Sequence, residues 1–185
     1  MSLGRCNLSR SFVSNSGAAV AKGEYFIFLD AGVFIPDPQE FFPKAISYFE
    51  SNKNLAGLTG MLKVLPECET YGDRIVFGII NTFMRIQNNI LHMGNAVGKF
   101  QMVKAEAFRA IHGFREDLIT AEDYDLFRRL AKIGRTRAEK SLIVYHNGRR
   151  EHALGWPRLL MLWSMNLLSY FLRGKSLSRE WTPIR

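Results

Sequence analysis

Residues 24–30 have the sequence EYFIFLD, and this stretch decides the fold class. Five apolar residues in a row, followed by an acid, predict a strand that is buried on both faces and has Asp30 at its carboxyl end. Helical and extended patterns alternate on either side of it, which favours an α/β fold of one domain's length. We expect strands at 24–30, 55–65, 100–103 and 141–146, and helices at 9–22, 38–51, 70–93, 105–111, 120–133 and 155–173, followed by an irregular tail at 179–185.

Two of these helices carry further expectations. The 70–93 helix is predicted to be amphipathic, with an apolar stripe. The 120–133 helix begins at TAED, which makes Thr120 the expected N-cap and places acids at the positive end of the helix dipole. The stripe of the 70–93 helix consists of Ile75, Ile79, Phe83 and Ile86.

The composition is that of a basic globular protein. Lys and Arg total 25 against 17 Asp and Glu, so the net charge is +8, which predicts attraction to a nucleotide, a nucleic acid or a lipid surface. The only cysteines, Cys6 and Cys68, form neither a disulfide framework nor a metal-ligand pair. We therefore expect a reducing compartment, the cytoplasm, and no secretory leader.

Carboxylates stand at two expected element ends. Asp30 is expected to bind a divalent cation or a ribose hydroxyl, or else to form the turn after its strand. Glu122, Asp123 and Asp125 place three acids in one helical turn, where their repulsion needs a counter-charge. One of them is a candidate general base for a hydroxyl nucleophile, and the alternative is that they complement the helix dipole.

Three further side chains lie near another expected strand end. His146 is the last residue of the 141–146 strand, where it is either a ligand of a divalent metal or a hydrogen-bonded structural residue. Arg149 and Arg150 follow it, and their guanidinium groups suit phosphate oxygens or plain surface solvation.

The C-terminal segment combines an apolar helix with aromatic and basic residues. Its apolar run, 159–172, is shorter than the roughly 20 residues that cross a bilayer. It either lies on an anionic membrane surface or packs on the domain's own core. We divide the chain into a core, 4–150, and this helix with its tail, 151–185. The expected interface residues are Trp156, Arg158, Trp163, Tyr170, Arg173, Lys175, Arg179 and Trp181.

Four blocks, in this order, resemble a family 2 glycosyltransferase of the GT-A fold. The first, 15–31, is similar to the helix and strand that precede the family's DXD motif. The second, GKFQMVKAEAFRAIHGF at 98–114, resembles the segment that usually ends in Gly-Gly-Phe, with His112 in place of the first glycine. The third, EDYDLFRRLAKIG at 122–134, looks like the ED-motif helix, and the fourth is VYHNGRR at 144–150.

The resemblance implies transfer of a sugar from a nucleotide-diphosphate donor to an acceptor hydroxyl, with inversion at the anomeric carbon. Carried over by position, Asp123 is the catalytic base, and Glu122 helps to place the acceptor or the base. The implied acceptor is a glycan, a lipid-linked sugar or a polysaccharide, reached at the inner face of a membrane.

The donor side follows in the same way. The resemblance implies that Asp30 binds a cation or the donor ribose, that His146 is a metal ligand, and that Arg149 and Arg150 bind the donor. The implied cation is Mg²⁺ or Mn²⁺, which would bridge the diphosphate oxygens and neutralise the leaving charge.

The sequence departs from the family pattern at two places. The DXD motif reads Asp30-Ala31-Gly32, so the second carboxylate is absent, and cation binding would depend on Asp30, His146 and water. Family members begin with further strand–helix units that hold the nucleotide base, and nothing similar precedes Gly4. We therefore expect a sheet incomplete at its N-terminal side, whose exposed edge strand favours a homodimer.

Two other functions compete with the transferase. The altered DXD motif favours a non-catalytic binding or scaffold protein, or an inactive fragment, of the same fold. The positive charge permits a nucleic-acid binder, but the charges are spread along the chain and no recognition motif is present, so no nucleic acid is expected as a partner.

Overall fold

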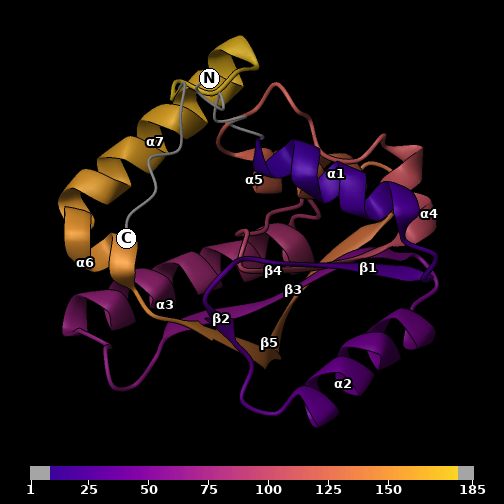
Figure 1. Ribbon diagram of the computed structural model, residues 1–185, viewed down its shortest axis with the longest axis horizontal. Coiled ribbons are helices and arrows are strands. Elements are labelled where there is room, and N and C mark those ends of the chain that lie inside the picture. The colour runs from indigo at the N-terminus through magenta and orange to yellow at the C-terminus, as the bar shows by residue number, and fades with distance from the viewer. Residues whose placement is uncertain (1–8, 179–185) are drawn as a thin grey trace, which may run out of the picture.

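A computed structural model describes residues 9–178 as a mixed α/β fold (Figure 1). This confirms the expected fold class. The elements are α1 (Arg10–Val20), β1 (Tyr25–Leu29), β2 (Val33–Phe34), α2 (Pro38–Ser51), β3 (Leu55–Val64), α3 (Tyr71–Arg85), the π-helical turn η1 (Ile86–Ile90), β4 (Phe100–Lys104), α4 (Ala105–Ala110), α5 (Glu122–Leu130), β5 (Arg135–His146), α6 (Arg149–Leu154) and α7 (Trp156–Arg173).

One five-stranded sheet has the order β1-β4-β3-β5-β2. Strand β4 is antiparallel to both β1 and β3, and β3 is parallel to β5, so β1, β3 and β5 share one direction. The carboxyl ends of β1 and β5 and the first residue of β4 therefore lie at the same end of the sheet. This topology brings Asp30, Lys99 and His146 to one side of the molecule.

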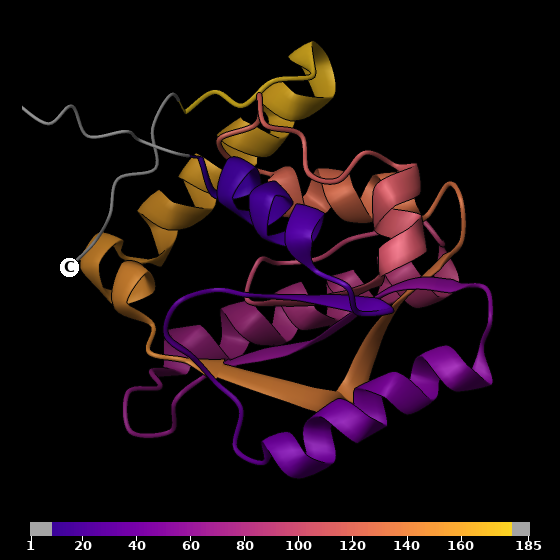
Figure 2. The same cartoon turned by 45° about the vertical axis from the view of Figure 1, so that its right-hand side comes forward.

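Helices cover both faces of the sheet (Figure 2). Helices α1, α4 and α5 pack on one face in a core that includes Phe26, Phe108 and Phe127. Helix α2 covers the other face, where Phe41 and Phe49 belong to a second core cluster. The first face positions the site, since it carries α1 and α5 side by side above the sheet.

Strand β1 corrects one sequence-based expectation. Phe26 is buried, but Ile27 and Leu29 are 40% and 47% exposed. The prediction that this strand is buried on both faces is wrong, because β1 is the outermost strand of the sheet. A run of apolar residues does not reveal the order of the strands, and an outermost strand can carry the same run as a central one.

Strand β5 begins at Arg135, six residues before the expected start. Its first half alternates charged and small residues, with Thr136 and Ala138 buried and Arg135 and Arg137 exposed. A register shift against β3 between Gly60 and Met61 bends the strand in its middle. Strand β2 and helix α6, which are short, were not expected from the sequence.

Helix α3 turns its expected apolar stripe outward. Ile75, Ile79 and Phe83 are 44%, 64% and 54% exposed, whereas Phe77 and Met84 are buried. Contact with β3 is partly polar, because the Asn81 amide donates to the Leu62 carbonyl at 2.8 Å and accepts from its N–H at 2.9 Å. The stripe is therefore surface and not core.

The start of α3 holds α7 in place through one buried carboxylate. Asp73 closes a capping box with Thr70, whose N–H donates to Asp73 Oδ2 at 2.8 Å. His152 Nε2 also lies 2.8 Å from Oδ2, and Trp156 Nε1 donates to Oδ1 at 2.9 Å. Although burial alone raises the pKa of Asp73, the bonds from His152, Thr70 and Trp156 outweigh it and hold that pKa below its ordinary value.

We expect Asp73→Ala to lower the free energy of unfolding by about 3 kcal/mol, because the donors on Thr70, His152 and Trp156 all lose their shared acceptor. Urea denaturation at pH 7 measures this change. Asp117→Ala is the matched control, since the Asp117 carboxylate is 51% exposed in its pair with Arg115, and it should cost less than about 1 kcal/mol. Equal losses in the two variants would contradict the anchoring role of Asp73.

Within residues 9–178, no helix is long and apolar enough to cross a bilayer.

Candidate functional site

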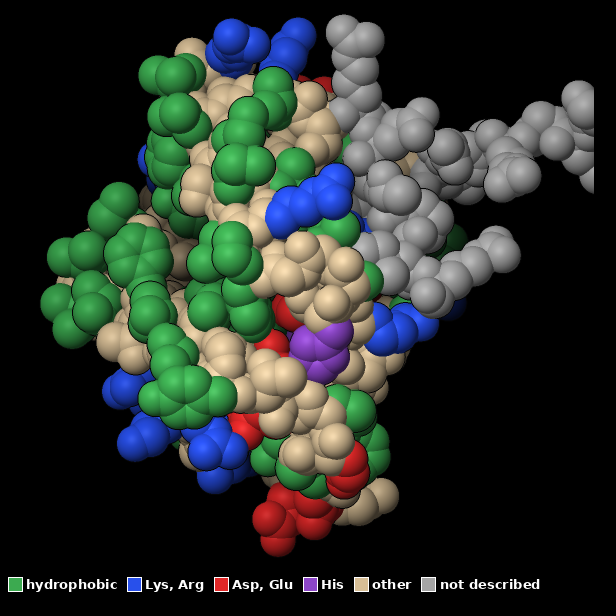
Figure 3. Space-filling view, turned by 90° about the vertical axis from the view of Figure 1, so that its left-hand side faces the viewer, with side chains coloured by type: hydrophobic (Ala, Val, Ile, Leu, Met, Phe, Trp, Pro, Cys, Tyr) green, Lys and Arg blue, Asp and Glu red, His purple; other side chains and the backbone are tan. Residues whose placement is uncertain are grey.

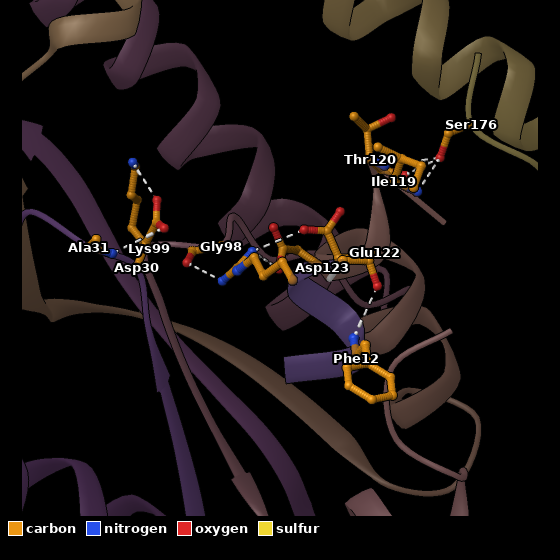
Figure 4. Close-up of polar contacts among 12 residues, drawn as sticks. Phe12, Asp30, Ala31, Gly98, Lys99, Ile119, Thr120, Glu122, Asp123 and Ser176 are labelled. Carbon is orange, nitrogen blue, oxygen red and sulfur yellow. Dashed lines mark hydrogen bonds and ion pairs between the residues drawn. The ribbon is translucent and has the colours of Figure 1, made fainter. Parts of the chain in front are cut away.

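The site forms where the first turns of α1 and α5 meet the end of β1 and the start of β4. Asp30 follows β1 directly, and its backbone N–H donates to the Lys99 carbonyl at 3.3 Å, one residue before β4. The Asp30 carboxylate then pairs with Lys99 Nζ at 2.8 Å. Figure 4 shows this pair on one side of Gly98 and the Glu122–Asp123 pair on the other.

Arg10 ties the Glu122–Asp123 pair to Gly98, and the sequence interpretation missed it. Its Nη1 donates to Asp123 Oδ1 at 2.7 Å and to Glu122 Oε1 at 3.1 Å, and its Nη2 donates to the Gly98 carbonyl at 2.6 Å. A side chain at position 98 would collide with both Arg10 and Asp123. Gly98 is therefore needed here for the close approach of the arginine and the acid.

The start of α5 explains how two adjacent acids reach this position. Ala121, not Thr120, is the N-cap, and it adopts a left-handed conformation with φ 64°. The expected Thr120 cap is wrong because the Thr120 hydroxyl donates instead to Asn166 Oδ1 at 2.8 Å, in α7. A left-handed alanine is strained, and such strain is often found at functional sites.

Burial changes the ionisation of both acids. It raises the pKa of Glu122 to about 7, aided by the charge of Asp123 and opposed by Arg10. Burial also raises the pKa of Asp123, although the ion pair with Arg10 opposes it. The Asp123 side chain is still 18% exposed, so a ligand can approach it. A carboxylate with a raised pKa is the stronger base that a proton transfer near neutral pH requires.

The raised pKa of Glu122 predicts a pH-dependent stability. Because the folded protein holds this proton more tightly than the unfolded chain, the stabilisation is complete below about pH 4.5 and is lost as the pH rises through about 7. We expect Glu122→Gln to remove this slope and to be more stable at pH 8 by roughly 2 kcal/mol. Urea denaturation of both proteins from pH 5 to 8 measures the difference, and parallel curves would contradict the assignment.

Asp30 differs from these two acids. Although partial burial acts to raise its pKa, the hydrogen bond and charge of Lys99, with a contribution from Arg10, hold it below the ordinary value. Asp30 is thus ionised, and both of its oxygens are engaged, since Oδ1 accepts from the Ala31 N–H at 3.1 Å.

His146 occupies the end of β5 as expected, but its ring is 3% exposed. Nδ1 accepts from the Gly148 N–H at 3.2 Å, so Nε2 carries the proton of the neutral ring. Nε2 is buried with no hydrogen-bond partner among the described residues, and the ring packs edge-on against Phe77 at 5.0 Å. Burial lowers the pKa of His146, against the charges of Glu151, Asp73 and Asp30.

These residues do not fit the expected site for Mg²⁺ or Mn²⁺. The Lys99 ammonium lies against Asp30 Oδ2 and would repel a cation there, position 32 is a glycine, and His146 directs a proton, not a lone pair, from its free nitrogen. Among residues 9–178, no group of three or more His, Cys, Asp or Glu side chains is arranged to hold a metal ion. Metal binding by Asp30 and His146 is thus not supported by the arrangement of these side chains.

The two arginines after His146 lie close to the Asp30 turn. A Cβ placed on Gly32 would lie 3.9 Å from Arg149 Nη2 and 3.8 Å from Asn147 Nδ2. Arg149 is exposed and Arg150 is partly buried. Burial lowers the pKa of Arg150, while the charges of Glu151 and Asp30 oppose this. The side of the site near Gly32 is therefore positively charged.

Comparison with known proteins supports the fold. No protein-family model matches the chain, and no curated protein matches it in sequence. Among solved structures, it is similar to the mannosyltransferase PcManGT from Pyrobaculum calidifontis, solved in complex with GDP-Man and Mn²⁺, with a TM-score of 0.58 and 15% sequence identity. The match covers 75% of this chain and 36% of that chain, so this chain corresponds to well under half of that protein. The chain thus has a glycosyltransferase-like fold.

Proposed function

We propose that the chain carries the catalytic acids of an inverting glycosyltransferase that uses a nucleotide-diphosphate sugar. The observation that carries the proposal is the cluster of charges at one end of the sheet. Arg10 forms ion pairs with Glu122 and Asp123 there, and Lys99 forms an ion pair with Asp30. The likeness to a protein solved with GDP-Man supports a nucleotide-sugar donor.

In this reaction Asp123 takes the proton of the acceptor hydroxyl. The acceptor oxygen forms a bond to the anomeric carbon, the bond from that carbon to the diphosphate oxygen breaks, and the nucleoside diphosphate leaves with the electron pair. Attack from the face opposite the leaving group inverts the anomeric centre. Glu122, protonated in part near neutral pH, shares Arg10 with the base and orients it.

The donor lies on the other side of Gly98 in this proposal. Asp30 faces the donor ribose, and Arg149 and Arg150 lie beside the same turn, where their guanidinium groups suit the phosphate oxygens.

Two measurements on the full-length protein test the function. Calorimetric titration with GDP-, UDP- and dTDP-sugars should detect binding of one donor, and NMR of the product's anomeric proton should show a configuration opposite to the donor's. Binding without turnover would favour the non-catalytic alternative. Failure to bind any donor would reject the transferase.

The acceptor side is proposed to meet an anionic membrane surface through α7. This helix buries polar side chains and exposes apolar ones. Asn166 and Ser169 are buried, whereas Met161, Leu168 and Leu172 are 60%, 58% and 75% exposed. Figure 3 shows hydrophobic side chains gathered on the side of the molecule that carries α3 and α7. An apolar surface of this kind suits a lipid or lipid-linked acceptor, and the net charge of +8 suits anionic headgroups.

The aromatic and basic residues expected at this interface differ in exposure. Trp156 and Tyr170 point toward the core, where they donate to Asp73 and Asp125 at 2.9 Å. Arg158, Arg173 and Lys175 are exposed near the ends of α7. Arg179 and Trp181 lie outside the described residues.

We expect Leu168→Glu to lower the fraction of protein bound to vesicles of equal phosphatidylglycerol and phosphatidylcholine by about tenfold, because the exposed leucine side chain would no longer contribute an apolar contact with the lipid. Vesicle flotation measures the bound fraction. Val20→Glu is the matched control, since Val20 is 79% exposed at the end of α1, and its binding should stay unchanged. Weak flotation of the unmodified protein would reject the membrane contact.

The homodimer expected from the sequence remains a prediction. The outer edge of β1 is the surface it would cover, and sedimentation of the full-length protein at high concentration tests it.

A further inference from the structure

The reaction proposed above releases a nucleoside diphosphate, so its negative charge must be met by a cation. In the expected arrangement, two carboxylates hold a divalent metal for this purpose. The second of them is absent, and Gly32, with φ 83°, is in a left-handed conformation that disfavours any other residue.

The surroundings of Gly32 suit an anion and not a cation. A side chain built on it would point toward the Asn147 amide nitrogen at 3.8 Å and Arg149 Nη2 at 3.9 Å. Both of these groups are hydrogen-bond donors, and one is positively charged. An oxygen of a phosphate group fits among them, whereas a metal ion would be repelled by the arginine.

Lys99 brings a further positive charge to this turn. Its ammonium lies 2.8 Å from Asp30 Oδ2 and is held there as part of an ion pair, and its side chain is 26% exposed. An ammonium has three N–H groups, and Asp30 uses one of them. Arg10, in contrast, directs donors to three protein acceptors. Lys99, and not Arg10, is therefore the cation that can donate further hydrogen bonds to a ligand.

We propose that Lys99, held by Asp30 and assisted by Arg149, binds the diphosphate group of the donor in place of a divalent cation. The inference rests on the proposed function and assigns the ligand of this part of the site as a nucleoside diphosphate. As the bond from the anomeric carbon to the diphosphate oxygen breaks, the ammonium stabilises the charge that develops on the leaving group. Asp30 acts here as a positioning residue, because it fixes the lysine.

The test is calorimetric titration of the full-length protein with GDP, UDP and dTDP, in EDTA and again in Mn²⁺. We expect the Kd of the preferred nucleotide to agree within about threefold between the two buffers. Lys99→Gln should weaken binding in EDTA by about tenfold or more, since a charge-assisted hydrogen bond is lost. Lys99→Arg should retain binding within about threefold, because the positive charge is kept.

Lys63→Gln is the matched control, since Lys63 is an exposed lysine on β3, and its Kd should equal that of the unmodified protein. Thermal melting of each variant shows whether the fold is intact. Binding that requires Mn²⁺ and ignores Lys99→Gln would overturn the inference while the transferase stands. No binding of any nucleotide in either buffer rejects the transferase, and the inference with it.

Discussion

Replacing Asp123 by asparagine is expected to lower kcat by about 10²- to 10⁴-fold, the range that general-base catalysis contributes. The amide cannot take the acceptor's proton, yet its oxygen can still accept the bond from Arg10 Nη1, now 2.7 Å long. Nucleotide binding should therefore be retained. Steady-state turnover of the full-length protein with its donor, together with calorimetric titration, separates these two effects.

The same variant distinguishes a catalytic from a structural role through its stability. Because burial raises the pKa of Asp123, its charged form is less favourable in the folded protein than in the unfolded chain. The stabilisation by the bound proton is complete below the ordinary pKa of an aspartate and is lost as the pH rises through the raised pKa, so at pH 8 Asp123→Asn should be as stable as the unmodified protein or more stable. A residue retained for stability would show a loss instead. Unchanged turnover, or a large drop in stability, would contradict the base assignment.

Asp117→Asn provides the control for this comparison. Asp117 precedes α5 and its carboxylate is 51% exposed in a pair with Arg115. Its replacement should change neither turnover nor the free energy of unfolding by a measurable amount. A loss of turnover in this variant would show that any charge change near α5 disturbs the site.

Local signals predicted the elements best. Helix α2 runs from Pro38 to Ser51 as expected, because Asp37 caps it and Phe41, Ala45 and Phe49 follow helical spacing. The end of β1 before Asp30 was also expected correctly, since a carboxylate after a run of apolar residues marks the exit of a strand. Signals of this kind depend on neighbours within a few residues.

Long-range arrangement was not accessible in the same way. The outward-facing stripe of α3 has the same helical spacing as a buried stripe, so periodicity alone could not assign its environment. The first half of β5 was missed because its charged residues, such as Arg135 and Arg137, mask the alternation with Thr136 and Ala138. The side of a helix or strand that meets water depends on the packing of the whole chain.

The site shows the same limit. Asp30, Glu122 and Asp123 were identified from motifs, and the structure brings them around one cluster of charges. Arg10 was missed because it is a single cation at the start of a weak helix, 112 residues before Glu122 in the sequence. Lys99 lay inside a recognised block but carried no assigned role. A signal did exist, since two acids in one helical turn require a counter-charge from elsewhere.

Arg10→Met is the second large expected effect, because it removes the charge that Glu122 and Asp123 share. Breaking a buried ion pair by removing one partner costs about 3 to 5 kcal/mol, and the Arg10 side chain is 32% exposed, which screens part of this. We expect the free energy of unfolding to fall by about 2 kcal/mol at pH 8. Urea denaturation measures it, and Arg85→Met, an exposed arginine at the end of α3, is the control.

The pH dependence makes this prediction specific to the ion pairs. Without Arg10, the pKa of Glu122 and that of Asp123 rise further, so both acids are neutral over a wider pH range and need no counter-charge there. The loss in stability should accordingly shrink as the pH falls from 8 to 5. The rise in rate on the acidic side of the pH–rate profile should move to higher pH, because the base must lose its proton before it can act. A loss that is the same at pH 5 and pH 8 would mean that Arg10 acts through packing alone.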